Sequence, residues 1–179
     1  MIEVLPIADV APAAVEQLLD RAFGTDRHGR TAYTIRKGMA AISALSFAAV
    51  QDGALIGTIQ CWPIRFAGDD GVDVAMVQLG PVAVAPDRQQ SGIGRALTAR
   101  ALAAAEAAGL ADAITLIGDP EYYGRFFGFD ASRTAGWHVP GPVERHRLLA
   151  RGGKVPAGAG MLAPRISAAS SVAAPALQR

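Results

Sequence analysis

Residues 82–97 read VAVAPDRQQSGIGRAL, and this stretch is the most informative part of the chain. It predicts a strand that ends near Val84, a polar loop, and a helix that starts on two glycines, Gly92 and Gly94. Alanine-rich sequence follows and predicts that the helix continues to about Ala108, where a glycine ends it. The apolar stripe predicted for this helix is Ile93, Leu97, Ala101, Ala104 and Ala108.

The start of that helix is suited to binding an anion. The first turn of a helix leaves backbone N–H groups without partners, and the macrodipole makes this end partly positive. A diphosphate supplies both the missing acceptors and the negative charge. A side chain at Gly92 or Gly94 would hold phosphates away from the backbone, and glycine tolerates unusual backbone angles. The alternative is an ordinary strand-to-helix turn that contains two glycines and binds nothing.

The glycine spacing excludes two common nucleotide sites. A P-loop needs lysine and then Ser or Thr after its second glycine, whereas Arg95 and Ala96 follow Gly94 here. The dinucleotide fingerprint Gly-x-Gly-x-x-Gly needs a third glycine where this chain has Leu97. The pattern that remains is Gln-x-x-Gly-x-Gly, which begins at Gln89.

The sequence on both sides of this segment predicts a mixed α/β (α+β) domain. Asp52-Gly53 is a strong hairpin signal, and Gly80-Pro81 interrupts a long apolar run at a place that suits a bulge. We expect a largely antiparallel sheet with helices on both faces. The expected strands are residues 2–5, 46–50, 55–65, 72–84, 113–117 and 143–150, and the other expected helices are residues 12–23, a short one ending near 37, and one opening at 119–120.

Composition limits the classes of function. The 179 residues make one domain, expected over residues 1–150, and residues 151–179 form a Gly/Ala/Ser/Pro-rich extension that is loosely packed or lies along the surface. A net charge of +1 gives no broad basic field, which argues against nucleic acid. Cys61 is the single cysteine, and the scattered histidines suggest no metal site. No signal peptide or membrane span is predicted, so we expect a cytoplasmic protein.

The motif and its flanks closely resemble the GNAT superfamily of acetyltransferases. Residues 116–129 read LIGDPEYYGRFFGF and are similar to a block of its YhbS-like bacterial branch. The resemblance implies the GNAT fold, with a mixed, mostly antiparallel sheet of about six or seven strands, about four helices on both faces, and a V-shaped splay between the fourth and fifth strands. It also implies that acetyl-CoA binds with its pyrophosphate on the glycine turn and its pantetheine arm along the splayed strand. The implied contact residues are Val82, Ala83, Val84, Gln89, Gln90, Ser91, Gly92, Ile93, Gly94 and Arg95.

The resemblance further implies direct attack of an amine on the thioester in a ternary complex, with a tyrosine as general acid. A phenol with a pKa near 10 stays protonated at neutral pH and can protonate the departing thiolate. Tyr123 is the expected acid and Tyr122 is the alternate. Residues 125–129 hold one phenylalanine more than the family pattern, and an extra residue inside the short helix would rotate its faces by about 100°.

The sequence does not identify a general base or the acceptor amine. Gln78 stands in the region where many relatives have a glutamate, which leaves Asp73, Glu121 or a water chain as candidates. The resemblance implies that the acceptor, a small molecule or a peptide, binds between residues 25–36 and 137–147. Arginines in these segments favour an acceptor with a carboxylate or phosphate, although a solvated basic rim is the simpler interpretation; they are Arg27, Arg30, Arg36, Arg145 and Arg147. A non-catalytic acyl-CoA-binding module is the alternative function, and a homodimer is possible.

Overall fold

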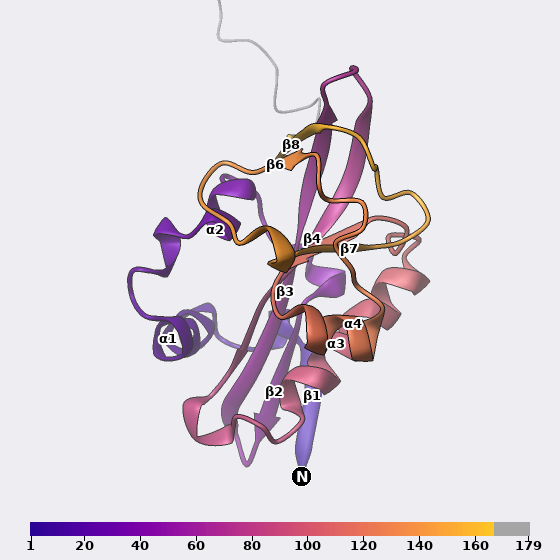
Figure 1. Ribbon diagram of the computed structural model, residues 1–179. Coiled ribbons are helices and arrows are strands. Elements are labelled where there is room, and N and C mark those ends of the chain that lie inside the picture. The colour runs from indigo at the N-terminus through magenta and orange to yellow at the C-terminus, as the bar shows by residue number, and fades with distance from the viewer. Residues whose placement is uncertain (167–179) are drawn as a thin grey trace, which may run out of the picture.

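A mixed sheet of eight strands runs through residues 1–166, which are the residues that the computed structural model describes (Figure 1). Six strands follow the order β1-β2-β3-β4-β5-β7, and β8 pairs with both β3 and β6. The strands are β1 (Ile2–Pro6), β2 (Phe47–Gln51), β3 (Ala54–Gly68), β4 (Asp73–Val84), β5 (Ile114–Ile117), β6 (Trp137–His138), β7 (Leu148–Arg151) and β8 (Gly160–Pro164). The predicted fold class is confirmed, and the very short β6 together with β8 brings the sheet above the expected six or seven strands.

The long strand β3 organises the sheet because it serves two partners on one edge. Its first part pairs with β2, with Phe47 opposite Ile59, and its last part pairs with β8, with Ile64 opposite Pro164. The turn between β2 and β3 is the predicted hairpin: Asp52 and Gly53 both have positive φ angles, 52° and 76°, as a two-residue type I′ turn requires.

Helices cover both faces of the sheet, as predicted. The α-helices of residues 1–166 are α1 (Pro12–Phe23), α2 (Thr31–Ile35), α3 (Ile93–Ala107) and α4 (Pro120–Phe127), and short 3₁₀ turns lie at Ile7–Asp9, Arg27–Gly29, Ser43–Leu45, Pro86–Arg88 and Arg145–Arg147. Figure 1 shows α1 and α2 on one side of β3 and β4, and α3 and α4 on the other. Side chains alternate along β4, so Ala83 packs on α1 while Val82 and Val84 face the core under α3. No helix within residues 1–166 is long and apolar enough to cross a bilayer.

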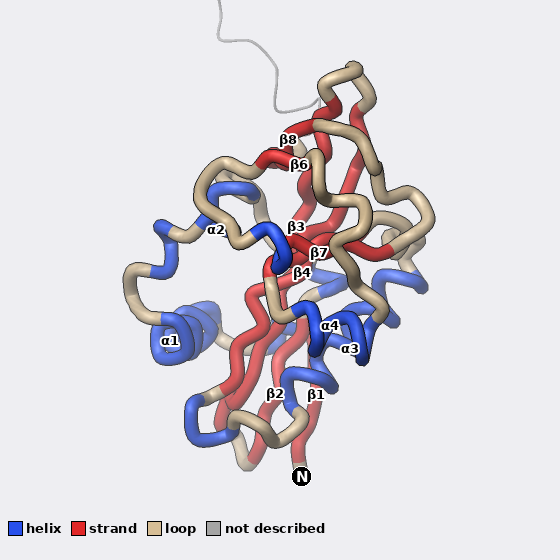
Figure 2. The backbone as a smooth tube through the Cα atoms, in the orientation of Figure 1, coloured by secondary structure: helices blue, strands red, loops and turns tan. Residues whose placement is uncertain are grey.

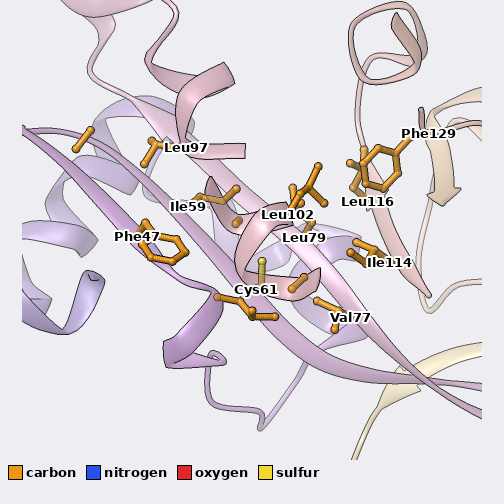
Figure 3. Close-up of a cluster of buried hydrophobic side chains, with 14 of the residues drawn as sticks. Phe47, Ile59, Cys61, Val77, Leu79, Leu97, Leu102, Ile114, Leu116 and Phe129 are labelled. Carbon is orange, nitrogen blue, oxygen red and sulfur yellow. The ribbon is translucent and has the colours of Figure 1, made fainter. Parts of the chain in front are cut away.

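The core under α3 joins this helix to five strands and to the end of α4, and Figure 3 shows part of it. Ile93, Leu97 and Ala101 are buried in it, as predicted for the helix stripe. The last member of the predicted stripe is wrong, because Ala108 is exposed. Ala104 is half-buried against this core, and Leu102 and Ala105 complete the buried face. Because alanine occurs on every face of this helix, the sequence pattern does not show clearly which face is buried. The bulkier Leu102 lies on the buried face.

The sheet splits between β4 and β5, which confirms the splay predicted between the fourth and fifth strands. The two parallel strands pair only through Val77 with Ile114 and Gln78 with Thr115. Past this point β4 continues to Val84 beside β3 without a strand partner on its other edge within residues 1–166. A bulge lies at the divergence, because Gly80 and Pro81 together stand opposite Gln60.

The C-terminal part differs from the sequence-based expectation. Residues 143–150 were expected to form one strand, but β7 begins only at Leu148, after a 3₁₀ turn, and Figure 2 shows that most of the chain between α4 and β7 is loop. Within the Gly/Ala/Ser/Pro-rich segment that begins near residue 151, β8 pairs with β3 and extends the sheet beyond residue 150. The remainder of that segment, residues 167–179, lies outside the described part of the chain.

Candidate functional site

The glycine turn forms an uncapped helix N-terminus at the end of β4. Gly92 is the N-cap of α3 in the left-handed conformation, with a φ angle of 83°, and no side chain accepts a hydrogen bond from the first turn. A β-carbon at Gly92 would meet no atom within 4 Å, so the space beside Gly92 is open. Ile93 is buried and fixes the helix start in the core. The first-turn amides therefore face outward with the geometry that binds anions.

The other residues predicted for the cofactor surround this turn. Gln89, Gln90 and Ser91 are exposed, and the Ser91 hydroxyl donates a hydrogen bond to the Arg88 carbonyl. The guanidinium of Arg95 lies 4.1 Å from the centre of the Phe126 ring and so connects α3 to α4. The structure thus brings residues 89–95 to the end of the splayed strand that carries Val82, Ala83 and Val84.

A cavity of about 260 Å³ opens where β4 and β5 separate. One wall is the bulge of β4 and the end of β5, and α4 adds Tyr123. The opposite wall comes from α1, α2 and the turn between them. Its lining comprises Phe23, Arg27, Arg30, Ala32, Tyr33, Arg36, Gln78, Leu79, Gly80, Pro81, Val82, Leu116, Ile117, Gly118, Asp119, Tyr123 and Arg147.

Of the two candidate tyrosines, Tyr123 lines the cavity and Tyr122 does not. Burial raises the pKa of Tyr123 to about 12, with a further increase from Tyr122 and a smaller opposing effect of Arg147. Tyr122 packs edge-on against Tyr123, with ring centres 4.9 Å apart, and its pKa is raised by partial burial and lowered by Arg95. Tyr123 therefore remains a neutral phenol, and a proton donor, well above neutral pH.

Both tyrosines lie in the first turn of the short helix α4, so the start of this helix determines their positions. Asp119 caps the helix by accepting a hydrogen bond from the Glu121 amide at 3.0 Å, and Pro120 occupies the first turn. Phe126 and Phe127 both lie inside the helix, but they follow the tyrosines, and Gly128 ends the helix in the left-handed conformation. The additional phenylalanine therefore leaves the position of Tyr123 relative to the cap unchanged.

The sequence predicted a solvent-exposed rim of arginines, and this is wrong for two of them. The side chains of Arg27 and Arg36 are buried, with only 2% and 5% of their surface exposed. Arg27 pairs with Glu16 and Asp20 and donates to the Tyr33 hydroxyl at 2.8 Å. Arg30 and Arg147 are exposed residues of the cavity wall. Arg145 instead donates to backbone carbonyls of residues 134, 135 and 137, which holds the loop before β7.

Neither carboxylate proposed as a base lines the cavity. Asp73 lies at the far end of β4 and pairs with Arg65 at 2.7 Å, and Glu121 is exposed outside the cavity. Asp119 is the acidic residue of the wall, which sequence reasoning treated only as a helix cap. Within residues 1–166, no group of three or more His, Cys, Asp or Glu side chains is placed to hold a metal ion.

Two further assignments concern aromatic and amide side chains. Trp137 is fully buried, packs against Phe66 and donates to the Pro156 carbonyl at 3.0 Å, so it supports the core and does not wall the cavity. Gln78 is 3% exposed and reaches the cavity with its amide. From the sequence, Gln78 was notable only because many relatives have a glutamate in this region. No local pattern indicates that Arg36 is buried.

Comparison with known proteins places this geometry among acetyltransferases. Residues 12–129 match the family model described as Acetyltransferase (GNAT) family. The structure is similar to GNAT family N-acetyltransferase YhbS from Escherichia coli in complex with CoA, with a TM-score of 0.67 and 23% identity over 90% of this chain and 88% of that one. A GNAT family acetyltransferase from Brucella melitensis in complex with acetyl-CoA gives a TM-score of 0.55 and 26% identity over 84% and 96%. No curated protein sequence matched.

Proposed function

Because the chain belongs to the acetyltransferase (GNAT) family, we propose that it transfers the acetyl group of acetyl-CoA to the amine of a small molecule or peptide. One observation carries this proposal: the open edge of β4 runs from beside the uncapped start of α3 to the cavity, where Tyr123 forms part of the wall. The start of α3 would bind the phosphates (the phosphate seat), the open edge of β4 would bind the pantetheine arm, and Tyr123 would donate the proton.

The residues present fit acetyl-CoA. The amides at the start of α3 would hold the pyrophosphate, since the space over Gly92 is open and no side chain competes for these donors. The edge of β4 at Val82 and Val84 faces no other strand within residues 1–166 and would hydrogen-bond the pantetheine arm. The Brucella melitensis protein, 26% identical to this chain, was crystallised with acetyl-CoA, which supports the same ligand here.

Two groups of the chain would assist the chemistry expected in the cavity. Because neither Asp73 nor Glu121 lines it, water would take up the proton that the attacking amine loses and would return one to Tyr123 after transfer. When bound, acetyl-CoA supplies an activated acetyl thioester. A backbone N–H of β4 near the bulge would stabilise the oxyanion, and the bulge leaves this edge free of strand pairing. Tyr123 holds its phenolic proton through neutral and alkaline pH and would donate it from Oη to the departing sulfur. The acceptor amine would enter from the side of α2, opposite Tyr123.

The test measures binding and turnover separately. Calorimetry on the full chain should show acetyl-CoA binding, and CoA release in the presence of a panel of amines should identify at least one acceptor. Mass spectrometry should find that this acceptor gains one acetyl group. Binding without CoA release across the panel would identify a non-catalytic acyl-CoA-binding module, and no binding at high micromolar acetyl-CoA would refute the proposal.

A further inference from the structure

The cavity contains a buried cation that no acidic side chain neutralises. Arg36 is 5% exposed, and within residues 1–166 no carboxylate lies within 4.0 Å of its guanidinium. This contrasts with Arg27, whose guanidinium is paired with both Glu16 and Asp20. A buried charge without a partner is costly, so buried cations are normally paired with an acid in the protein or in a ligand.

The aromatic neighbours of Arg36 leave its hydrogen-bonding edge available. The guanidinium lies 4.1 Å from the centre of the Tyr33 ring and 4.4 Å from that of Trp62. A guanidinium that packs on aromatic rings keeps its N–H donors in its own plane, where they can still bind an acceptor. Within residues 1–166, one long hydrogen bond, 3.4 Å from Nη1 to the Ala32 carbonyl, uses this edge. A planar carboxylate matches such an edge through two parallel hydrogen bonds.

Gln78 supplies a second group without a partner beside Arg36. Its Nε2 donates to the Ala32 carbonyl at 3.1 Å, and this is the same oxygen that accepts from Arg36. That bond fixes the orientation of the amide, because a flipped amide would bring two oxygens together. Oε1 of Gln78 is then a buried acceptor without a hydrogen-bond partner in residues 1–166. An amine N–H is a donor that would satisfy it.

The position of this pair links it to the reaction proposed above. The Trp62 indole that covers Arg36 donates to the Gly80 carbonyl at 2.8 Å, at the bulge where β4 leaves β5. Gln78 is two residues before this bulge, and Tyr123 lies on the wall of the same cavity. A volume of about 260 Å³ is at the small end for ligand cavities, which favours a small acceptor.

We propose, on the basis of the function proposed above, that the acceptor is a small amine that also carries a carboxylate, of the amino acid type. Arg36 binds the carboxylate, and Gln78 Oε1 accepts a hydrogen bond from the amine. Because both side chains converge on one carbonyl oxygen, the amine and the carboxylate lie close together in the ligand, as they do in α- and β-amino acids. The exposed Arg30 and Arg147 at the wall add positive potential that attracts an anion.

The decisive experiment compares matched acceptors on the unaltered protein. Acetyl-CoA turnover is measured with the common amino acids, with their carboxamides, and with the corresponding amines that lack the carboxyl group. We expect kcat/KM for the best amino acid to exceed that for its carboxamide and its plain amine by at least about tenfold. Equal or better turnover of the uncharged members would overturn this inference and leave the proposed acetyl transfer intact. A preference for 2-aminoethylphosphonate over β-alanine would also overturn the carboxylate assignment.

A variant pair assigns the preference to Arg36. Arg36→Gln should reduce kcat/KM for the amino acid to about that for its carboxamide, so that the ratio between the two acceptors falls to about one. Arg65→Gln removes the same charge from β3 outside the cavity and should leave both values as they are. Thermal unfolding and acetyl-CoA affinity report whether each variant is folded. If no amine in the panel is turned over, calorimetry with CoA and N-acetylamino acids decides: binding that the matched amides lack supports the inference, and its absence refutes it.

Discussion

The ring of Tyr123 packs directly against the backbone of Gly118: a β-carbon added at residue 118 would lie 2.6 Å from Cε2 of the ring. Gly118 ends the strand that forms one wall of the cavity, and Tyr123 stands on the helix that follows. The absence of a side chain at Gly118 is thus what allows the phenol to lie against the cavity wall. The glycine has no positive φ angle, so its role is close packing.

Gly118→Ala should therefore displace the phenol and slow the reaction. We expect kcat to fall at least about tenfold, because general acid catalysis depends on the proton being within hydrogen-bonding reach. Acetyl-CoA affinity, measured by calorimetry, should change little, since the glycine turn is untouched. Gly153→Ala is the matched control, because a β-carbon there meets no atom within 4 Å. An unchanged kcat in Gly118→Ala would show that the position of Tyr123 is unimportant.

Removing the phenolic hydroxyls separates the two adjacent tyrosines. Tyr123→Phe should reduce kcat by about 10²-fold, in the range of general acid catalysis, with the affinity for acetyl-CoA nearly intact. Tyr122→Phe should retain most activity, because Tyr122 does not line the cavity. Steady-state kinetics of both variants with one acceptor provide the comparison. The reverse order of effects would assign the acid to Tyr122.

The raised pKa of Tyr123 predicts the alkaline side of the pH profile. Burial raises this pKa to about 12, so the fraction of protonated phenol stays high through pH 10. An acid must be protonated to act, so we expect no decline in kcat around pH 10 that depends on Tyr123. A decline that persists in Tyr123→Phe would belong to another group, such as Arg36, whose pKa is lowered by burial to about 10. The measurement is kcat against pH up to the limit of stability, with Tyr123→Phe for comparison. A decline with a midpoint near pH 10 that vanishes in this variant would contradict the assignment.

The sequence predicted those parts of the site that depend on local pattern. The glycine turn, the hairpin at Asp52-Gly53 and the cap of α4 are each determined by neighbouring residues, and they form where expected. The resemblance to the GNAT superfamily, read from the same residues, is confirmed by the family match over residues 12–129. Local pattern also located the bulge at Gly80-Pro81, although it did not show what faces it.

The features that the sequence did not predict depend on contacts between residues that are far apart in the chain. Arg36 looks like a rim residue in sequence, but it is buried beside the rings of Tyr33 and Trp62, and Trp62 belongs to a strand that is distant in the sequence. Gln78 looks like the loss of a carboxylate, and the orientation of its amide depends on the carbonyl of Ala32 in α2. The local sequence of β8 has little preference for a strand. The segment becomes a strand because it pairs with the end of β3.

The ion pairs of Arg27 should stabilise the wall formed by α1 and α2. Burial lowers the pKa of Arg27, but hydrogen bonds with Glu16, Tyr33 and Asp20 outweigh it, and the net pKa is raised. Arg27→Leu leaves two partly exposed carboxylates without their cation, and we expect the free energy of unfolding to fall by about 2 kcal/mol. Denaturant unfolding measures this loss. Arg65→Leu breaks the exposed pair with Asp73 and should cost less than about 1 kcal/mol, so equal losses would contradict the role of burial.

The phosphate seat is tested most cleanly at Gly94. Substitution of Gly92 strains the backbone whatever the side chain, because its φ angle is 83°, so lost binding there has two explanations. At Gly94 a β-carbon would make ordinary contacts, 3.6 Å from Val84 and 3.7 Å from Val82, and φ is not positive. We therefore expect Gly94→Leu to fold, which thermal unfolding checks, to place a side chain between the first turn of α3 and β4, and to weaken acetyl-CoA binding at least about tenfold by calorimetry. Ala99→Leu, on the exposed face of the same helix, controls for added bulk. If Gly94→Leu is folded and binds acetyl-CoA as tightly as the unaltered protein, the pyrophosphate does not lie on the start of α3.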